Sequence, residues 1–396
     1  MKSKLKIAVY SGEIPSTTFI ENLIKGLGQT GITVYVFGIK RKHISYSCLN
    51  IHIFATPSHP FYKGLITLWR SFLLLLVHPK RFFILMGQLS NYDSYYGKWQ
   101  WWSRVLPVLL HFPDIFHIQW AKDLNQWMFL KERFNCKLVL SFLGSHINYS
   151  PIADTSLALT YKQNFPMVDA FHAVSEAIGK EAEQYGASPA KTVCIRTILD
   201  DTLFRNFIPK KDLDVPLKIV SIGRHHWVKG YEYALAAMVL LKERQIPFHY
   251  DIIAQGDVSE KLLFMNRHLG LDDFISFKEG MKQADLFLAL KNYDILLLPS
   301  VSEGIANVVL EAMAIGLPVV STNCGGMAEV VIPNKTGWLV PVRDPEALAS
   351  AIQEVAETPE KEIQRITLQA HEFVSQHFNA ESSITQFLEL YSRVMD

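Results

Sequence analysis

Short apolar runs alternate with segments of helical periodicity in the first half of the chain. Lys4–Tyr10 and Ile32–Phe37 have the composition of short buried strands. Between them, Phe19–Leu27 places apolar residues at positions 19, 20, 23, 24 and 27, which is the spacing of one helix face. Further strands are predicted at Ile115–Ile118, Lys137–Phe142 and Ala170–Val174.

The second half repeats this alternation. Strands are predicted there at Leu217–Ile222, Tyr250–Ala254, Asp294–Pro299 and Leu317–Ser321. Strands separated by helices favour parallel sheets covered by helices on both faces. We therefore predict an α/β protein with two doubly wound domains, residues 1–205 and 217–375. The Pro-containing segment 206–216 is the predicted linker, and residues 376–396 should form a helix that packs back towards the first domain.

Length and composition agree with two globular domains. The chain has 396 residues, of which 49% are hydrophobic and 19% charged, so it is too long for one ordinary core and too apolar for disorder. The apolar run Ile7–Tyr10 is too short for a signal peptide. The cysteines are far apart and form no C-x-x-C pair, which favours a reducing compartment and a cytoplasmic protein: Cys48, Cys136, Cys194 and Cys324.

The net charge of +1 hides an asymmetry between the two halves. Up to Pro216 there are 24 Lys and Arg against 15 Asp and Glu, and the remainder has 15 against 23. A basic first half suggests an anionic partner surface. No nucleic-acid-binding signature accompanies the charge, so we expect no nucleic acid partner and favour a membrane leaflet.

Two motif matches are interpreted as incidental. Gly26–Gly31 fits G-x-G-x-x-G, but that fingerprint functions between a strand end and a helix start. Here it follows the predicted first helix, and a helix C-cap with a turn explains its glycines. The DxD-like Asp212–Asp214 lies in the linker and is interpreted as solvated, so no metal site is expected.

Two basic residues follow the first strand of the second half. Ser221–Gly230, SIGRHHWVKG, ends a predicted strand and contains Arg224 and Lys229. Open α/β sheets bind ligands at the carboxyl ends of their strands. A guanidinium and an ammonium there neutralise a diphosphate without a metal ion. Taken alone, the pair is equally typical of two surface cations.

The segment Leu296–Val320 adds an anion site and two carboxylates. Its strand leads through the loop SVSEG into a helix predicted over Ile305–Ala314. Amides at a helix N-terminus attract anions, and Gly304 leaves room for a ligand to approach. Glu303 in the loop and Glu311 in the helix are placed to bind hydroxyl groups of different parts of one extended ligand. The Gly325-Gly326 turn and Gly223 bring further main chain to the same edge.

Residues 217–345 resemble the C-terminal half of family-4 glycosyltransferases of the GT-B fold. The resemblance rests on the R-x4-K pair Arg224 and Lys229, the E-x7-E pair Glu303 and Glu311, and the run EGIANVVLEAMAIGLPVV. It implies that the basic pair binds the donor diphosphate, that Glu303 holds the donor sugar, and that Glu311 holds the ribose. The donor-binding candidates are Gly12, Thr17, Gly223, Gly304, Ile305, Ala306, Asn307, Val308 and Glu311, with Arg224, Lys229 and Glu303 as catalytic candidates.

The first half resembles family-4 enzymes that assemble bacterial exopolysaccharide, with two departures. In Gly12–Leu27 a Gly-Gly pair typical of the wider family is replaced by Ser16 and Thr17, so Gly12 and Thr17 become candidates for donor contact. Thr17 is equally a candidate N-cap of the following helix. In Lys137–Asn148 the usually polar position after the strand is Leu143, and His146 is a candidate replacement.

Two further segments point to the acceptor. His117-Ile118-Gln119-Trp120 resembles the acceptor-side segment of the family, although His117 is equally well explained as a core histidine. Phe61–Arg104 has six Lys and Arg against one acid and twelve aromatic residues. Its apolar run Phe72–Val77 is too short to span a bilayer, so we interpret the segment either as an anionic membrane contact or as a cover of the core.

These features together predict a two-domain enzyme that transfers a sugar from a nucleotide sugar to a glycan or lipid-linked acceptor. The resemblance implies retention of anomeric configuration, no cofactor and a role in surface polysaccharide synthesis. The cytoplasmic protein would lie at the inner face of the membrane. One alternative is an epimerase of the same fold, for which Glu13 is the acid/base candidate. The other is a degenerate, non-catalytic binding subunit, suggested by Leu143 and the missing Gly-Gly pair.

Overall fold

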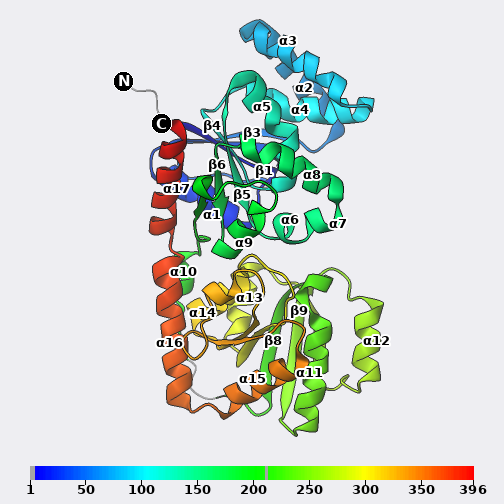
Figure 1. Ribbon diagram of the computed structural model, residues 1–396, viewed down its shortest axis with the longest axis vertical. Helices are drawn as coiled ribbons and strands as arrows, with labels where there is room; N and C mark the ends of the chain where they lie inside the picture. Colours follow the sequence, from blue (N-terminus) through cyan, green and yellow to red (C-terminus); the bar gives the residue numbers. More distant parts are fainter. Residues whose placement is uncertain (1–4, 210–212) are drawn as a thin grey trace. The chain divides into compact units, whose positions relative to one another are not determined.

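The structure, a computed structural model, describes residues 5–209 and 213–396. Lys4 and residues 210–212, which include part of the predicted linker and Asp212 of the DxD-like motif, lie outside these ranges. The chain forms two compact units (Figure 1). The first comprises Met1–Ala173, Gly179–Ile198 and Ala380–Asp396, and the second comprises Val174–Ile178 and Leu199–Asn379. The observed boundary near residue 199 thus precedes the predicted linker at 206–216.

The first unit contains a seven-stranded parallel sheet in the order β3-β2-β1-β4-β5-β6-β7. Its strands are β1 (Lys6–Ile14), β2 (Thr33–Lys40), β3 (Ile51–Pro57), β4 (Ile115–Ile118), β5 (Lys137–Phe142), β6 (Ala170–Ala173) and β7 (Thr192–Cys194). Its helices are α1 (Thr18–Gln29), α2 (Pro60–Val77), α3 (Pro79–Gln88), α4 (Tyr95–Leu110), α5 (Leu124–Phe134), α6 (Ser145–Asn148), α7 (Ser150–Ala153), α8 (Thr155–Asn164) and α17 (Ala380–Met395), while α9 (Glu176–Glu183) crosses a unit boundary.

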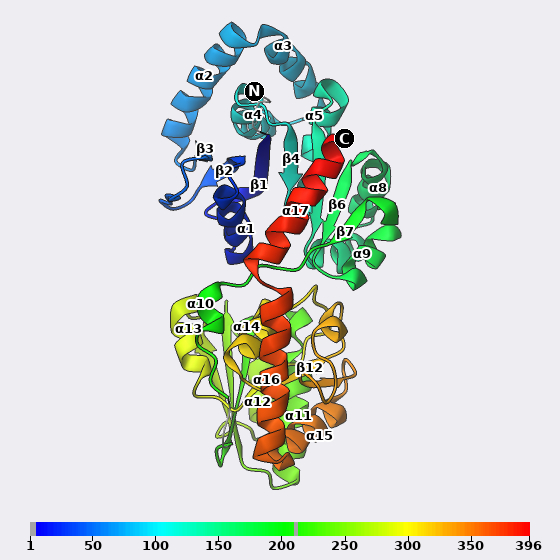
Figure 2. The ribbon, with the colours of Figure 1, turned by 90° about the vertical axis from the view of Figure 1, so that its left-hand side faces the viewer.

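Alternate residues of β1 face opposite sides of this sheet, as the pleat requires. Ile7 and Val9 join a buried cluster that α1 and α17 complete. On the other face, the Tyr10 ring lies 5.7 Å from that of Phe116. Figure 2 shows α17 lying across the first unit beside α1.

The structure shows that two of the three glycines in the G-x-G-x-x-G match do not cap the C-terminus of α1, as the sequence had suggested. Helix α1 extends to Gln29, so Gly26 and Gly28 lie inside the helix, and of the three glycines only Gly31, at φ +81°, lies in the turn. A Cβ at Gly26 would be 2.5 Å from Ile384 of α17, and one at Gly28 would be 2.5 Å from Ile51 of β3. The two helical glycines therefore allow close packing on both sides of α1.

Helices α2 and α3 meet at an angle at the end of the first unit (Figure 2). Helix α2 turns its apolar residues outward: Phe61, Leu65, Leu68, Trp69, Phe72 and Leu76 are each more than half exposed. Its buried residues instead include Lys63 and Thr67. Helix α2 thus has the reverse polarity of an ordinary surface helix.

The second unit contains a six-stranded parallel sheet in the order β10-β9-β8-β11-β12-β13. Its strands are β8 (Leu217–Arg224), β9 (Phe248–Gln255), β10 (Ile275–Glu279), β11 (Ile295–Leu298), β12 (Val319–Thr322) and β13 (Trp338–Val340). Its helices are α10 (Asp201–Phe204), α11 (Tyr231–Glu243), α12 (Glu260–His268), α13 (Gln283–Leu290), α14 (Asn307–Ile315), α15 (Pro345–Glu357) and α16 (Glu360–His377).

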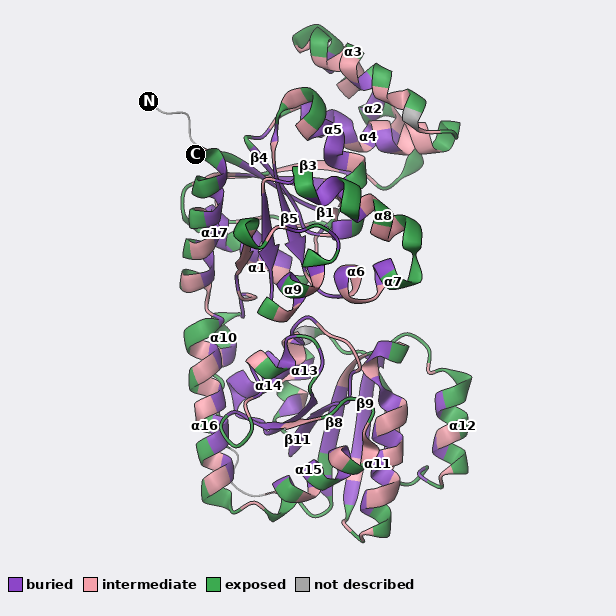
Figure 3. Ribbon diagram, viewed as in Figure 1, coloured by how far each residue is buried: buried purple, intermediate pink, exposed green. Residues whose placement is uncertain are grey.

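Figure 3 shows the central strands of the second unit as buried and helix α12 as largely exposed. The four residues of β11 are all buried, because helices cover both faces of this sheet. One apolar cluster contains α14 and α16, and the other contains α11 and α15. The structure thus confirms the predicted α/β class with two doubly wound parallel sheets.

Candidate donor site

The strand order of the second unit reverses between β8 and β11. Strands β9 and β10 follow β8 on one side, whereas β11, β12 and β13 lie on the other. At such a switch point the loops after the two central strands diverge and leave room for a ligand at the carboxyl edge. Arg224 ends β8, and Ser300 follows the end of β11, so the predicted clamp and the SVSEG loop begin at this point.

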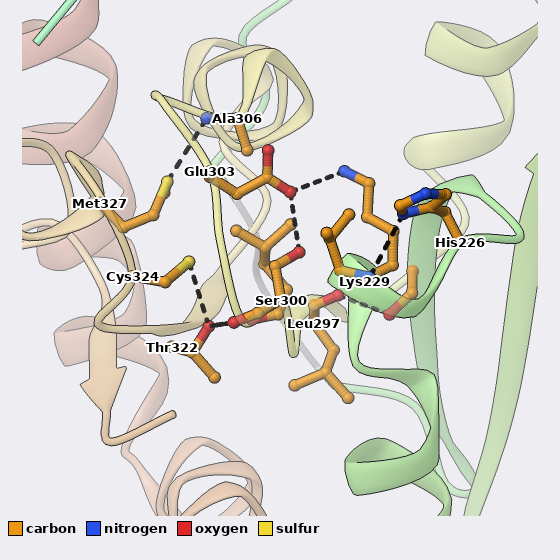
Figure 4. Close-up of polar contacts among 12 residues, drawn as sticks. His226, Lys229, Leu297, Ser300, Glu303, Ala306, Thr322, Cys324 and Met327 are labelled. Atoms are coloured by element: carbon orange, nitrogen blue, oxygen red, sulfur yellow. Dashed lines mark hydrogen bonds and ion pairs between the residues drawn. The ribbon is translucent and has the colours of Figure 1, made fainter. Parts of the chain in front are cut away.

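Lys229 and Glu303 meet beside the switch point (Figure 4). Lys229 Nζ lies 2.7 Å from Glu303 Oε1, and their side chains are 15% and 16% exposed. The Ser300 hydroxyl donates to the same carboxylate oxygen at 2.8 Å. Lys229 and Glu303 were predicted to contact different parts of a donor, whereas in the structure they form one partly buried ion pair.

A tight turn brings Lys229 to this position. Lys229 ends the short 3-10 helix Trp227–Lys229, and Gly230 follows at φ +62°. A Cβ at Gly230 would lie 2.1 Å from the carbonyl oxygen of Pro299. Glycine is thus required both by the left-handed conformation and by the approach of the β11 loop.

The Gly325-Gly326 turn supports the loop that contains Glu303. Gly325 has φ +55°, and a Cβ there would lie 1.9 Å from the carbonyl oxygen of Glu303. The amide of Gly326 donates to the carbonyl of Gly304 at 2.7 Å. On the strand side, the Thr322 hydroxyl donates to the carbonyl of Ser300. Main chain on both sides therefore holds the carboxylate of Glu303 in place.

Helix α14 begins at Asn307, two residues later than predicted. Ala306 is its N-cap, and the Ala306 amide donates to Met327 Sδ at 3.4 Å. Ile305 and Ala306 are buried, whereas Asn307 and Val308 are partly exposed. The backbone N–H of Ala306 therefore already has a partner in the Met327 sulfur. The backbone N–H groups of the first turn of α14 lie at the helix N-terminus, where the helix dipole favours an anion.

The other donor candidates lie around the same edge. Glu311 is 8% exposed and sits little more than one turn into α14, closer to the N-terminus than predicted. The Arg224 side chain is exposed and forms no ion pair within the described ranges. A Cβ at Gly223 would lie 2.9 Å from both Lys229 Cε and the Tyr231 hydroxyl. Gly223 thus makes space for the lysine side chain.

Burial keeps the nearby weak acids in their neutral forms. Burial, and then the charge of Glu303, raise the pKa of Tyr231 above its usual range. Burial raises the pKa of the Cys324 thiol to about 12, with Glu303 raising it further and Lys229 opposing. No group of three or more His, Cys, Asp or Glu side chains among residues 5–209 and 213–396 is placed to hold a metal ion. The charge of this site therefore resides in Arg224, Lys229 and the glutamates.

The first unit has its own switch point, between β1 and β4. Gly12 lies there at φ +82°, next to a bulge in β1. Thr17 occupies the N-cap position of α1, but its side chain makes no cap hydrogen bond. Glu21 instead accepts from the amide of Ser16 at 2.7 Å. Thr17 is therefore the N-cap residue of α1, as predicted, but its side chain does not cap the helix.

His117 is a core residue and not a surface contact. Its side chain is 0% exposed, with Nδ1 2.7 Å from the Tyr391 hydroxyl and Nε2 2.8 Å from Ser141 Oγ. Burial and neighbouring His172 lower its pKa well below the usual value. Gln119 is 1% exposed. In this structure neither residue is accessible to an acceptor, which corrects the prediction of a sugar contact.

His146 is partly buried at the edge of the first unit, and its Nδ1 is buried without a hydrogen-bond partner among the described residues. It lies in α6, just after β5, with its ring centroid 5.4 Å from that of Trp120. Burial, and then Lys122, lower its pKa to about 4, so the imidazole is neutral at pH 7. Leu143 is partly exposed one residue before Gly144. The replacement of a polar contact at 143 by His146 stays a prediction.

Comparison with known protein families decides what the second unit is. Residues 204–371 match the family described as Glycosyl transferases group 1. The match covers less than half of the chain but includes the whole Lys229–Glu303 site. We refer to residues 204–371, after this match, as the group 1 domain.

Two proteins similar to part of this chain are named for polysaccharide biosynthesis. The putative colanic acid biosynthesis glycosyltransferase WcaL of Salmonella typhimurium is 30% identical over 240 residues, 59% of each chain. The amylovoran biosynthesis glycosyltransferase AmsK of Erwinia amylovora is 33% identical over 188 residues, 46% of each chain. The chain thus spans less than two thirds of the length of these curated relatives.

Solved structures resemble the whole chain in fold. The Anabaena protein HepE, solved in complex with UDP and glucose, has a TM-score of 0.70 at 18% identity and covers 98% of this chain and 99% of its own. Sucrose-phosphate synthase from Thermosynechococcus elongatus has a TM-score of 0.73 at 20% identity, with 99% of both chains covered. The predicted GT-B class, with two Rossmann-like parallel-sheet units, is confirmed.

The group 1 domain brings together residues that the sequence singled out, and one that it did not. Lys229, Glu303, Gly304 and the Gly325-Gly326 turn form one cluster. The role of Ser300 as a donor to Glu303 was missed, although its place directly after a buried strand was a usable signal. Glu13, the acid/base candidate of the epimerase alternative, is exposed and paired with Arg41 at 2.6 Å.

Proposed function

We propose that this chain is a family-4 retaining glycosyltransferase. It transfers a sugar from a nucleotide-diphosphate sugar to a glycan or lipid-linked acceptor in surface polysaccharide biosynthesis. The observation that carries the proposal is the Lys229–Glu303 pair at the switch point of the group 1 domain. The names of the polysaccharide-synthesising relatives and the UDP and glucose complex of HepE support the choice of substrate class.

The site suits stabilisation of a leaving nucleoside diphosphate. Cleavage of the sugar–phosphate bond places negative charge on the diphosphate oxygen. Arg224, Lys229 and the first amides of α14 supply positive charge at one edge of the sheet, where it stabilises that oxygen. Lys229 has three N–H donors and one goes to Glu303, so it can contact a phosphate while the ion pair holds its side chain in place.

The clamp is tested with Arg224→Ala and Lys229→Ala. Each should lower turnover of the best donor from a panel of UDP-, GDP- and ADP-sugars by about 100-fold or more, because it removes charge needed where the leaving group forms. Lys261→Ala is the matched control, since Lys261 pairs with Glu232 on the surface of the same unit. Thermal unfolding reports on folding. Near wild-type turnover of either clamp variant at saturating donor would contradict the assignment.

We further propose that the protein binds an anionic membrane at its cytoplasmic face through residues 61–104. Helix α2 is 18 residues long and passes the length and composition test for crossing a membrane, with 17% of that stretch buried. In the sequence, the longest uninterrupted apolar run of this segment is only six residues, because Lys63 and Arg70 interrupt the apolar stretch. Both side chains turn inward, Lys63 to Gln100 and Arg70 to the carbonyl of Ala55, so the outward face is continuous.

A third basic side chain of this segment also points inward, which reduces the positive charge at the outward surface. Arg81 donates to the carbonyl of Leu109 at 2.7 Å and lies over the ring of Phe112. Lys80 is exposed. Fewer cations therefore face outward than the count of six suggests, and the apolar side chains of α2 are expected to supply most of the binding energy.

A further inference from the structure

The first unit contains a pocket of about 420 Å³ at the carboxyl ends of β2 and β3. Residues at the carboxyl ends of β2 and β3, at the start of α2 and along Tyr96–Arg104 of α4 line it. Three cationic side chains line it, Arg41, Lys63 and Arg104, together with Tyr96 and Trp99. Neither the family match, which begins at residue 204, nor the sequence motifs account for this pocket.

Within residues 5–209 and 213–396, Lys63 and Arg104 form no ion pair with a carboxylate, whereas Arg41 does. Lys63 is 6% exposed, and its ammonium donates to the amide oxygen of Gln100. The Nε of Arg104 is buried and has no hydrogen-bond acceptor among the residues that the structure describes. Buried donors and charges ordinarily have partners, because leaving them unmet is costly. The wall of the pocket therefore presents unmet positive charge.

Among the residues that the structure describes, neither nearby acid, Glu13 or Asp123, forms an ion pair with Lys63 or Arg104. Glu13 is exposed and engaged by Arg41, whose Nε and Nη2 both donate to its Oε1. Burial raises the pKa of Asp123 to about 6, with the charge of Arg104 opposing the rise. Burial, and then the charge of Arg104, lower the pKa of Lys63. Lys63 and Arg104 thus repel each other across the pocket, and an anion between them would relieve both.

We propose that this pocket binds a phosphate or diphosphate group of the acceptor, an inference that rests on the proposed function. Arg104 offers a guanidinium edge and Lys63 an ammonium, a combination that suits phosphate oxygens. The volume exceeds that of one phosphate, and the rings of Tyr96 and Trp99 border the remainder, where an apolar sugar face can pack. Since the exposed apolar stripe of α2 begins at Phe61, two residues before Lys63, a lipid attached to the phosphate would lie along it.

The test uses inorganic pyrophosphate as the probe, titrated calorimetrically into the full-length chain. The double variant Arg224→Ala/Lys229→Ala serves as the background, because the donor clamp also suits pyrophosphate. In this background pyrophosphate should still bind. Adding Arg104→Gln, or separately Lys63→Met, should weaken that binding by about tenfold or more, the loss expected for a charge-assisted contact. Adding Lys98→Gln, on α4 but outside the pocket, should leave it unchanged.

A second arm distinguishes the source of the phosphate. In the otherwise wild-type protein, Arg104→Gln should raise KM for the true acceptor while donor binding stays unchanged. A rise in KM with a lipid-linked diphosphate in vesicles, but not with a soluble sugar phosphate, would identify a lipid-linked phosphate as the source, and the reverse result would identify a soluble one. Absence of pyrophosphate binding in the clamp-deficient background would overturn the pocket and leave the donor site untouched. Failure of every donor to bind, with Arg104-dependent pyrophosphate binding intact, would instead overturn the proposed function.

Discussion

A single oxygen of Glu303 accepts from both Lys229 and Ser300. The ion pair holds both side chains of the site before any ligand arrives, which lowers the entropy lost on binding. It also means that each residue partly neutralises the other. A ligand that contacts the carboxylate must therefore share it with the ammonium.

Glu303→Gln and Glu311→Gln should weaken the binding of different ligands, because the two carboxylates are expected to contact different parts of the donor. Glu311→Gln should weaken a nucleoside diphosphate and the full donor alike, by about ten- to hundredfold, because the ribose is common to both. Glu303→Gln should weaken only the sugar-bearing ligand. It should leave the nucleoside diphosphate unchanged or tighter, since Lys229 loses its competing carboxylate. Calorimetric titration of both ligands measures this, and equal losses for both ligands in the Glu303 variant would exclude the division of roles.

Residue spacing predicted the donor site better than it predicted the acceptor side. Lys229 and Glu303 follow strands that are adjacent in the sheet, so their proximity follows from strand order. His117 looked equally like a contact or a core residue, because its deciding partner, Tyr391, lies 274 positions away. Such a pairing depends on how the last helix packs, which local pattern does not report.

At the scale of elements, α2 and α3 determine how the protein would meet a membrane. Trp69→Ala combined with Phe72→Ala should reduce binding to anionic vesicles by about 100-fold or more, since each side chain loses roughly 1.5–3 kcal/mol of transfer free energy. Folding should be unaffected because both rings are exposed. Co-sedimentation at low and high salt measures the binding.

Charge variants give the matched comparison for that experiment. Lys80→Glu on α3 should weaken binding at low salt only, because exposed charges are screened within about 8–10 Å. Lys42→Glu, which follows β2 outside the segment, should have little effect. Unchanged recovery of the Trp69/Phe72 variant, or no recovery of the wild-type protein with any vesicle, would refute the membrane proposal.

Element positions were predictable where packing agrees with local pattern. β4 and β5 have the predicted bounds, because their apolar runs coincide with the buried parts of the chain. Helix α1 contains Gly26 and extends past its predicted end at Leu27, through Gly28 to Gln29. Glycine ordinarily weakens a helix, but here the contacts with Ile384 and Ile51 favour it. At Gly26 and Gly28, tertiary packing therefore outweighs the low helix propensity of glycine.

At the scale of the whole chain, the first unit is completed by the last helix. Phe387 of α17 is buried in the same cluster as Ile7 and Ile24. Phe387→Ala should destabilise the first unit by about 3–5 kcal/mol through loss of apolar burial and the cavity left behind. Arg393→Ala, exposed on the same helix, should be neutral.

Hydrogen exchange resolved by peptide distinguishes the two units in this experiment. Protection should fall in β1, β4 and β5 of the Phe387 variant while β8 and β11 keep theirs. The opposite pattern, with protection lost first in the second unit, would show that α17 does not belong to the first core. Tyr391→Phe, which removes only the hydroxyl bonded to His117, should cost about 1 kcal/mol in the same unit.

The return of α17 has a consequence for biosynthesis. The ribosome makes the chain from its N-terminus, so all of Leu199–Asn379 exists before the first residue of α17. N-terminal domains generally fold first during synthesis, but here the first unit is completed only after the whole second unit has been synthesised. Until α17 is released, the sheet face beside α1 stays open to water. A chaperone that recognises exposed apolar surface would therefore find its binding site on the first unit, after the second has already folded.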